Sequence, residues 1–176
     1  FTERNGKPFG TNELKSHPWI ADFIYTSCTS ECPLMSAEMA RLLKALPEQT
    51  PVRLVSFTVD PEVDTPPRLA EYAERFQAKS EIWKFLTGPR EKQYTLAQKG
   101  FHLPAQAVDV SSQQHHAPEH EHGKAASTPK ENPFLHSQKF VLVDQDLQIR
   151  GYYDSTRPEE LERLLKVDLP RLLKNP

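Results

Sequence analysis

The two cysteines of this 176-residue chain, Cys28 and Cys32, are separated by three residues in the segment DFIYTSCTSECP (residues 22–33). An apolar run that favours a strand ends just before Cys28, and a pattern typical of a helix begins near Cys32. Cysteine pairs this close form a disulfide or bind a soft metal ion, and both reactions require the thiolate. Because a helix N-terminus has a partial positive charge, we expect it to lower the pKa of both thiols.

The C-x3-C spacing is one residue longer than the C-x2-C of thioredoxins, so the loop can more easily hold two sulfurs apart around an ion. A disulfide remains compatible with this spacing. The cysteines could instead be small buried hydrophobic residues, or form a disulfide that only closes a loop. Their position at a junction between a strand and a helix argues against that alternative.

Two thiolates select Cu(I), and an added imidazole gives a site that also holds Cu(II). The chain has seven histidines, of which His17 and His102 flank predicted elements and are expected to be surface or packing residues. His136 stands just before a predicted strand at 139–143, where its ring could reach the cysteines. A single histidine before a strand is more often an ordinary surface residue, so spacing alone leaves the role of His136 open.

Strand and helix patterns alternate through the first hundred residues. Strands are predicted at 19–26, 52–59 and 82–87, and helices from Pro33 to near Pro47, at 68–76 after an N-cap at Thr65, and at 91–101. This alternation predicts parallel strands joined by right-handed crossovers, with functional loops at the C-terminal ends of the strands. Cys28 and Asp60 each follow one of these strands.

The remaining segments complete an α/β chain that we expect to form one domain over residues 1–176. Residues 1–10 predict a hairpin with a two-residue turn at Asn5-Gly6, and Gly100 is expected to close the helix at 91–101. Residues 103–133 lack periodicity and predict an exposed, His-rich insertion. A second hairpin is predicted from strands at 139–143 and 148–153, and a closing helix at 158–173.

Charge and hydropathy exclude several classes of partner. Lys and Arg total 22 against 24 for Asp and Glu, a net charge of −2, so there is no basic surface for nucleic acid or for an anionic membrane. No segment approaches the roughly 20 apolar residues that span a bilayer, and no signal peptide is visible. The chain begins at Phe1, so an N-terminal piece with a membrane anchor could have been removed.

Several motifs, in this order along nearly the whole chain, resemble the Sco/SenC family. They are FIYTSC at 23–28, CP at 32–33, VDPEVDT at 59–65, HS at 136–137 and FVLVD at 140–144. The resemblance implies a thioredoxin-like fold, with a central mixed sheet flanked by helices, in a protein that handles copper during assembly of the binuclear copper centre of cytochrome c oxidase. It also implies that Cys28, Cys32 and His136 are the copper ligands, and that Asp60 and Asp64 form the family's D-x3-D element.

The same resemblance implies a location in the periplasm or the mitochondrial intermembrane space, with the full-length protein tethered to the membrane. Its partner would be the copper-site subunit of cytochrome c oxidase or another copper chaperone. Two departures from the family pattern put local charge and partner choice in question. Thr29-Ser30-Glu31 replaces the frequent Pro-Asp pair between the cysteines, and Leu135 stands where an Asp is common.

Four histidines lie within eight residues of the predicted insertion, at His115, His116, His120 and His122. With Glu119 and Glu121 between them, they could bind Cu(II), Ni(II) or Zn(II) at low affinity, or pass copper inward. The alternative is a solvated loop without a metal. The two alternatives differ in how many copper ions the chain would bind.

Three functions compete for the cysteine pair. A copper chaperone would use both thiolates with His136, whereas a thiol-disulfide oxidoreductase would attack with Cys28 and resolve with Cys32, without needing the histidine. In the first case Asp60 and Asp64 could steer a cationic partner or tune the site, or simply begin the next helix. A peroxidase is disfavoured, because the Thr-x-x-Cys signature is one residue short and no arginine lies nearby in the sequence.

Overall fold

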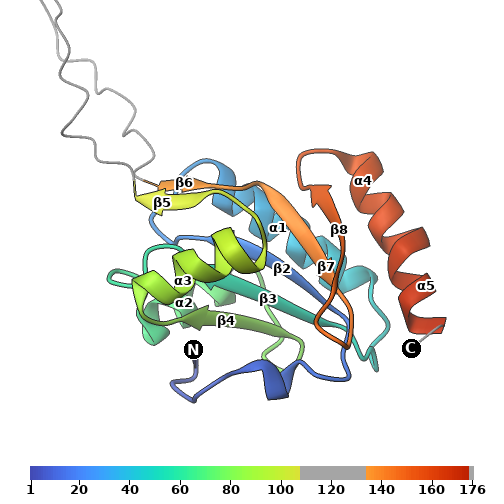
Figure 1. The fold of residues 1–176 in the computed structure, drawn as a ribbon, viewed down its shortest axis with the longest axis horizontal. Helices are drawn as coiled ribbons and strands as arrows, with labels where there is room; N and C mark the ends of the chain where they lie inside the picture. The colour runs from blue at the N-terminus through green and yellow to red at the C-terminus, as the bar shows by residue number, and fades with distance from the viewer. Residues whose placement is uncertain (108–133, 175–176) are drawn as a thin grey trace, which may run out of the picture.

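The computed structural model describes residues 1–107 and 134–174, and for 105–107 and 134–136 the backbone alone. The main sheet has six strands in the order β1-β4-β3-β2-β7-β8 (Figure 1). The strands are β1 (Thr2–Glu3), β2 (Trp19–Ile24), β3 (Arg53–Thr58), β4 (Trp83–Thr87), β7 (Lys139–Val143) and β8 (Ile149–Asp154). The helices are α1 (Glu31–Ala45), α2 (Pro66–Arg75), α3 (Arg90–Thr95), α4 (Pro158–Arg163) and α5 (Leu169–Lys174), with short helical turns η1 (Thr11–Glu13), η2 (Leu96–Gly100) and η4 (Leu164–Asp168).

The centre of the sheet confirms the predicted strand and helix alternation. β2 pairs in parallel with β3, and β3 in parallel with β4. β7 runs antiparallel to β2 and forms the predicted hairpin with β8, so the sheet is mixed. All six residues of β2 are buried, as expected for a strand covered by helices on both faces.

Helices cover both faces of this sheet, with α3 in front and α1 behind in the view of Figure 1. α1 buries Met35, Met39 and Leu42, which recur at helical spacing. It is tied to α2 by a hydrogen bond of 2.9 Å between the hydroxyls of Ser36 and Tyr72. α1 and α2 are thus held together as one layer, and α1 carries Cys32 in its first turn.

Aromatic rings fill the space between the sheet and the segment around α3. Phe23 stacks on Phe57 with ring centroids 5.3 Å apart. Phe101 packs edge-on against Phe23 and against Trp19, at 5.4 and 5.7 Å. Because aromatic pairs gain from both burial and ring geometry, this cluster fixes the position of α3 over β2 and β3.

The N-terminal hairpin forms, but its turn is longer than predicted. Gly6 N–H donates to Glu3 O at 2.8 Å, and Glu3 N–H donates to Lys7 O at 2.9 Å, so three residues rather than two reverse the chain. Gly6 has φ +81°, the left-handed conformation that such three-residue turns require. The structure also places β1 antiparallel to β4 as an edge strand of the main sheet, which the sequence did not predict.

Two of the predicted helices, at 91–101 and 158–173, contain a π-helical turn that the sequence did not predict. The helix predicted at 91–101 begins at Arg90 and ends in the π-helical turn η2. Its left-handed residue is His102, with φ +53°, so Gly100 does not close the helix in the way predicted. The closing helix contains the π-helical turn η4 just before Pro170, and a proline explains it because its ring clashes with the carbonyl four residues earlier.

A separate two-stranded sheet is formed by β5 (Ala105–Ala107) and β6 (Phe134–His136). The pairs are Ala105 with His136, Gln106 with Leu135 and Ala107 with Phe134. The segment at 103–133, which we expected to be irregular, therefore contains the strand β5 near its start. A strand of three residues with mixed composition is too short to show a pattern in the sequence. The predicted metal tract from His115 to His122 lies outside the described residues.

Candidate metal and redox site

Two loops form the candidate site at one edge of the main sheet. One connects β2 to α1 and contains Cys28, and the other connects β3 to α2 and contains Asp60. Because β2 and β3 are parallel neighbours, both loops leave the sheet at its same edge. Val59 N–H donates to Ile24 O at 2.8 Å, so the two chains stay paired up to the start of the loops.

Both cysteines lie at this edge as thiols, with no disulfide between them. Cys28 lies in the loop and is 6% exposed, and Cys32 lies in the first turn of α1 and is fully buried. The backbone N–H of Cys32 donates to Cys28 Sγ at 3.3 Å. An amide at the helix N-terminus therefore points at the Cys28 sulfur, the geometry that stabilises a thiolate.

The pKa of Cys32 is raised above its usual range by its hydrogen bond with Cys28 and by burial. The prediction that the helix N-terminus lowers the pKa of both thiols is therefore wrong for Cys32. The reason is that the hydrogen bond with Cys28 and burial outweigh the backbone hydrogen bond with Tyr25, which lowers the pKa of Cys32. Burial also raises the pKa of Tyr25, and its hydrogen bond with Cys28 acts in the same direction.

The residues between the cysteines add polar groups beside the Cys28 sulfur. Cys28 Sγ lies 3.8 Å from Ser30 Oγ and 3.9 Å from Glu31 Oε2, and the Ser30 hydroxyl donates to the Glu31 carboxylate. These are two of the residues that replace the frequent Pro-Asp pair. This difference from the family pattern thus places the carboxylate of Glu31 next to the thiol of Cys28.

The carboxylate of Asp64 links the cysteine loop to strand β3 through hydrogen bonds. Its carboxylate accepts hydrogen bonds from Thr26 N–H at 3.0 Å, from Thr26 Oγ1 at 2.5 Å and from Thr58 Oγ1 at 2.5 Å. Thr26 Oγ1 in turn accepts a bond of 2.7 Å from Arg68 Nε at the start of α2. The position two residues before Cys28 is therefore tied to β3 and to α2.

Burial raises the pKa of Asp64, although its hydrogen bonds with Thr26 and Thr58 act in the opposite direction. The side chain is completely buried, which argues against steering a partner and leaves the two other predicted alternatives, tuning the site or beginning the next helix. Asp60 is 6% exposed, and its pKa is raised by burial and by the nearby Asp64. Thr65 precedes α2 as predicted, but its side chain makes no capping bond.

The topology brings the backbone of His136 to the same edge of the sheet. In the antiparallel pairing of β7 with β2, Val141 lies opposite Ala21, and earlier residues of β7 run toward the C-terminal end of β2. His136 lies three residues before the first residue of β7, Lys139, and pairs with Ala105 in the small sheet. The order of elements thus places the chain at His136 on the side where β2 leads into the Cys28 loop.

The other described histidines lie away from this edge. His17 precedes β2, at the end of the strand opposite to Cys28, and its Nδ1 lies 2.9 Å from Pro51 O. His102 is exposed after η2. Both match the expectation of surface or packing residues. Among the side chains that the structure describes, no group of three or more His, Cys, Asp or Glu residues is arranged to hold a metal.

Several residues of the site were not foreseen from the sequence. Thr26, Thr58 and Arg68 position the loop, and Tyr25 contacts the Cys28 sulfur. A threonine immediately after an apolar strand is a common surface residue, and nothing local pairs Thr26 with Asp64, 38 positions away. Their roles depend on parallel strand pairing, which becomes visible only in the fold.

Two known proteins are similar to this chain in sequence. The chain is 43% identical over 89 residues to the SCO1 protein homolog of Bacillus subtilis, which covers 50% of this chain and 46% of that protein. It is 32% identical over 175 residues to a Stutzerimonas stutzeri protein named "Putative copper-binding protein", which covers 98% of this chain and 74% of that protein. The matched segment thus spans less than half of the B. subtilis relative.

Solved structures give the same fold. A SCO1/SenC family lipoprotein from Bacillus anthracis superposes with a TM-score of 0.79 at 31% identity, covering 98% of this chain and 91% of that chain. BsSco, described as a Sco family cytochrome c oxidase assembly protein with a disulfide switch, superposes with a TM-score of 0.66 at 28% identity, covering 96% and 91%. No described helix of the present chain is long and apolar enough to cross a membrane.

The decisive comparison is with the SCO1/SenC family as a whole, whose sequence profile matches residues 1–167. The matched range contains Cys28, Cys32, Asp60, Asp64 and His136. The mixed sheet with helices on both faces is the thioredoxin-like architecture expected from the sequence. The chain belongs to the SCO1/SenC family.

Proposed function

We propose that this protein binds copper through the thiolates of Cys28 and Cys32 and the imidazole of His136, and delivers it to the copper site of cytochrome c oxidase. The observation that supports this most directly is the pair of reduced cysteines at the helix N-terminus, where the amide of Cys32 donates to Cys28 Sγ. Two soft thiolates with one imidazole form a donor set suited to both copper oxidation states.

Family membership supports the choice of metal and target. The Stutzerimonas stutzeri relative has copper binding in its name, and BsSco belongs to a family of cytochrome c oxidase assembly proteins. Copper is here the cargo rather than a resident cofactor. Transfer would proceed by ligand exchange, with cysteines of the target replacing Cys28 and Cys32 one at a time.

The partner and location follow from this proposal. The target would be the copper-site subunit of the oxidase or another copper chaperone. The family resemblance implies that this exchange takes place outside the cytoplasm, in the periplasm or an equivalent compartment, and the B. anthracis neighbour is a lipoprotein. We propose the same extracytoplasmic setting for this chain, with attachment to the membrane through a segment outside residues 1–176.

The ligand assignment is tested by copper titration of reduced His136→Ala. We expect the affinity for Cu(II) to fall at least about tenfold, and the sulfur-to-copper absorption band to disappear, because one of three ligands is removed. The two thiols should remain titratable with a disulfide reagent. His102→Asn is the matched control, since it removes an exposed imidazole and Asn tolerates a left-handed backbone. An absorption band unchanged in His136→Ala would refute the assignment.

A second function, thiol-disulfide exchange, is favoured by the difference between the two cysteines. Cys28 would attack a disulfide of the target and release one target thiolate. Cys32 would then attack the Cys28 sulfur and release the second, so that two electrons pass to the target and a Cys28–Cys32 disulfide remains. The disulfide switch described for BsSco supports such chemistry. Retained reduction of a target disulfide by His136→Ala, after loss of copper binding, would establish this function separately.

A further inference from the structure

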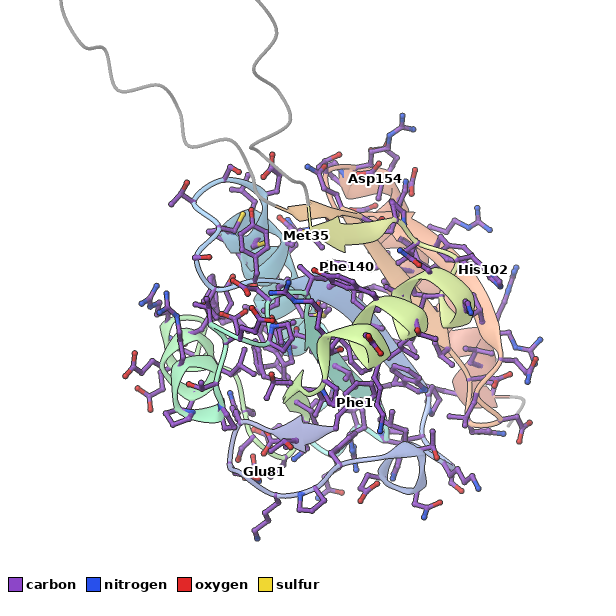
Figure 2. All side chains as sticks on the ribbon, turned by 60° about the vertical axis from the view of Figure 1, so that its left-hand side comes forward. Phe1, Met35, Glu81, His102, Phe140 and Asp154 are labelled. Carbon is purple, nitrogen blue, oxygen red and sulfur yellow. The ribbon has the colours of Figure 1, made fainter. Side chains whose placement is uncertain are left out.

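The phenol of Tyr25 forms a hydrogen bond with the side chain of Cys28 inside the candidate site. Tyr25 is 2% exposed, and burial together with this bond raises the pKa of the phenol, as expected when the phenol is the donor and the sulfur the acceptor. Cys28 N–H also donates to Tyr25 O at 3.2 Å, so the chain turns back between the two residues. Met35, three residues after Cys32, marks this end of α1 in Figure 2.

The backbone on both sides of Tyr25 is held by hydrogen bonds to the β3–α2 segment. On one side Val59 N–H donates to Ile24 O at 2.8 Å. On the other side Thr26 N–H donates to the Asp64 carboxylate at 3.0 Å. A side chain whose backbone is fixed in this way keeps its position while its neighbour reacts. The phenol of Tyr25 is therefore in place before any reaction of the thiols.

The bond from Tyr25 is worth most when the sulfur of Cys28 is negatively charged. The phenol and the backbone N–H of Cys32, at 3.3 Å, both donate to this sulfur, and such donors stabilise a thiolate. The Glu31 carboxylate, 3.9 Å from the sulfur, has the opposite effect because it repels a thiolate. A sulfur in a disulfide is uncharged and accepts hydrogen bonds only weakly. Formation of a disulfide therefore leaves the buried phenol without a strong acceptor, which is unfavourable.

We propose that Tyr25 holds the cysteine pair in its reduced, copper-binding form. The phenol stabilises the anionic sulfur of Cys28, whether it is a thiolate or a copper ligand, and it loses this acceptor when Cys28 and Cys32 form a disulfide. Tyr25 acts through Cys28, so it is a positioning residue and not a ligand. Its effect on copper rests on the function proposed above, whereas its effect on the disulfide does not.

The disulfide equilibrium of the metal-free protein is measured with mixtures of reduced and oxidised dithiothreitol. Two electrons and two protons pass from the cysteine pair to oxidised dithiothreitol, and mass spectrometry after alkylation gives the fraction of disulfide. We expect Tyr25→Phe to shift this equilibrium toward the disulfide at least about fivefold, because only the hydroxyl is removed. Tyr72→Phe is the matched control, since it removes a buried hydroxyl that bonds to Ser36 at 2.9 Å, and it should behave like the wild type. No shift in Tyr25→Phe, or equal shifts in both variants, would overturn the proposal.

The sulfur-to-copper absorption of the Cu(II)-loaded protein is the second measurement. In Tyr25→Phe the band should keep its intensity and move to longer wavelength, because the lost donor no longer lowers the energy of the sulfur electrons. In Tyr72→Phe the band should stay in place. A band at the same wavelength in the wild type and in Tyr25→Phe would contradict the role of Tyr25 alone. Absence of the band from the wild type would instead refute the proposed copper site, and the disulfide equilibrium would then decide the role of Tyr25.

Discussion

At the scale of single residues, the two thiols of the site are in different environments. Cys28 lies in a loop, receives the amide of Cys32 and has Ser30 and Glu31 beside its sulfur. Cys32 lies under the first turn of α1, and its pKa is raised by its hydrogen bond with Cys28 and by burial. Cys28 is therefore the thiol that a reagent or a target protein meets first.

This difference predicts an order of alkylation. In the reduced, metal-free protein, iodoacetamide should modify Cys28 at least about fivefold faster than Cys32, because attack requires an accessible thiolate. Peptide mapping by mass spectrometry at early times measures both rates in one sample. In urea the two rates should converge, since both thiols are then exposed. Equal rates in the folded protein would contradict the assignment of Cys28 as the outer thiol.

The sequence predicted the position of these residues better than their surroundings. The position of the cysteine pair at a junction between a strand and a helix follows from residue types and spacing and is confirmed, whereas its copper and redox chemistry stays a prediction. The raised pKa of Cys32 could not be predicted, because it depends on the hydrogen bond with Cys28 and on burial under α1, which only the fold determines. The ligand role of His136 remains a prediction that rests on the family pattern.

At the scale of elements, the site depends on how the β3–α2 loop holds the β2–α1 loop. Asp64 bonds to Thr26 on one side and to Thr58 on the other, and Arg68 adds a bond to Thr26 from α2. The raised pKa of Asp64 shows that burial opposes its charge more than these bonds support it. The carboxylate thus acts as a structural link between the two loops rather than as a surface charge.

Replacement of Asp64 by Ala should destabilise the fold and loosen the cysteine loop. The change leaves a backbone N–H and two hydroxyls without their acceptor, which we expect to lower the free energy of unfolding by about 2–4 kcal/mol. Urea denaturation measures this loss, and faster alkylation of Cys28 in native buffer measures the loosening. Asp146→Ala, in the exposed β7–β8 turn, should change stability by less than about 0.5 kcal/mol. Similar stability of the two variants would refute the linking role.

Elements with strong periodicity were predictable, and those set by tertiary contacts were not. The buried strand β2 and the amphipathic helix α1 follow from local pattern. The pairing of β1 with β4 and the small sheet of β5 and β6 join segments far apart in the sequence, and β1, β5 and β6 are only two or three residues long. Strands this short carry too few residues to show an alternation.

At the scale of the whole molecule, the fold separates two regions. The cysteine loops lie where β2 and β3 end, and an apolar hollow lined by Phe1, Trp19 and Phe101 lies toward the N-terminal segment. Buried residues of both regions, among them Cys28, Cys32 and Trp19, belong to one hydrophobic core. Because one core connects both regions, we propose that residues 1–176 form a single domain, as the sequence predicts. The small sheet extends this framework to His136.

The number of copper ions bound by the whole chain tests the histidine tract separately from the core site. We propose that replacing all four histidines at His115, His116, His120 and His122 with Asn leaves one equivalent of copper bound, with the sulfur-to-copper band unchanged. The wild type should take up further Cu(II) equivalents at lower affinity, because imidazoles supply nitrogen ligands without thiolates. Optical and electron-spin titrations of the reduced protein distinguish the two populations.

A double variant, His17→Gln with His102→Asn, is the control for loss of imidazoles elsewhere and should retain every equivalent. If the tract variant lost the sulfur-to-copper band, the tract would be part of the core site. If it bound as much Cu(II) as the wild type, the tract would be a solvated loop without a metal. One surviving equivalent with a full band would assign the core site to Cys28 and Cys32 without the tract histidines, because thiolate-to-copper absorption requires the cysteines.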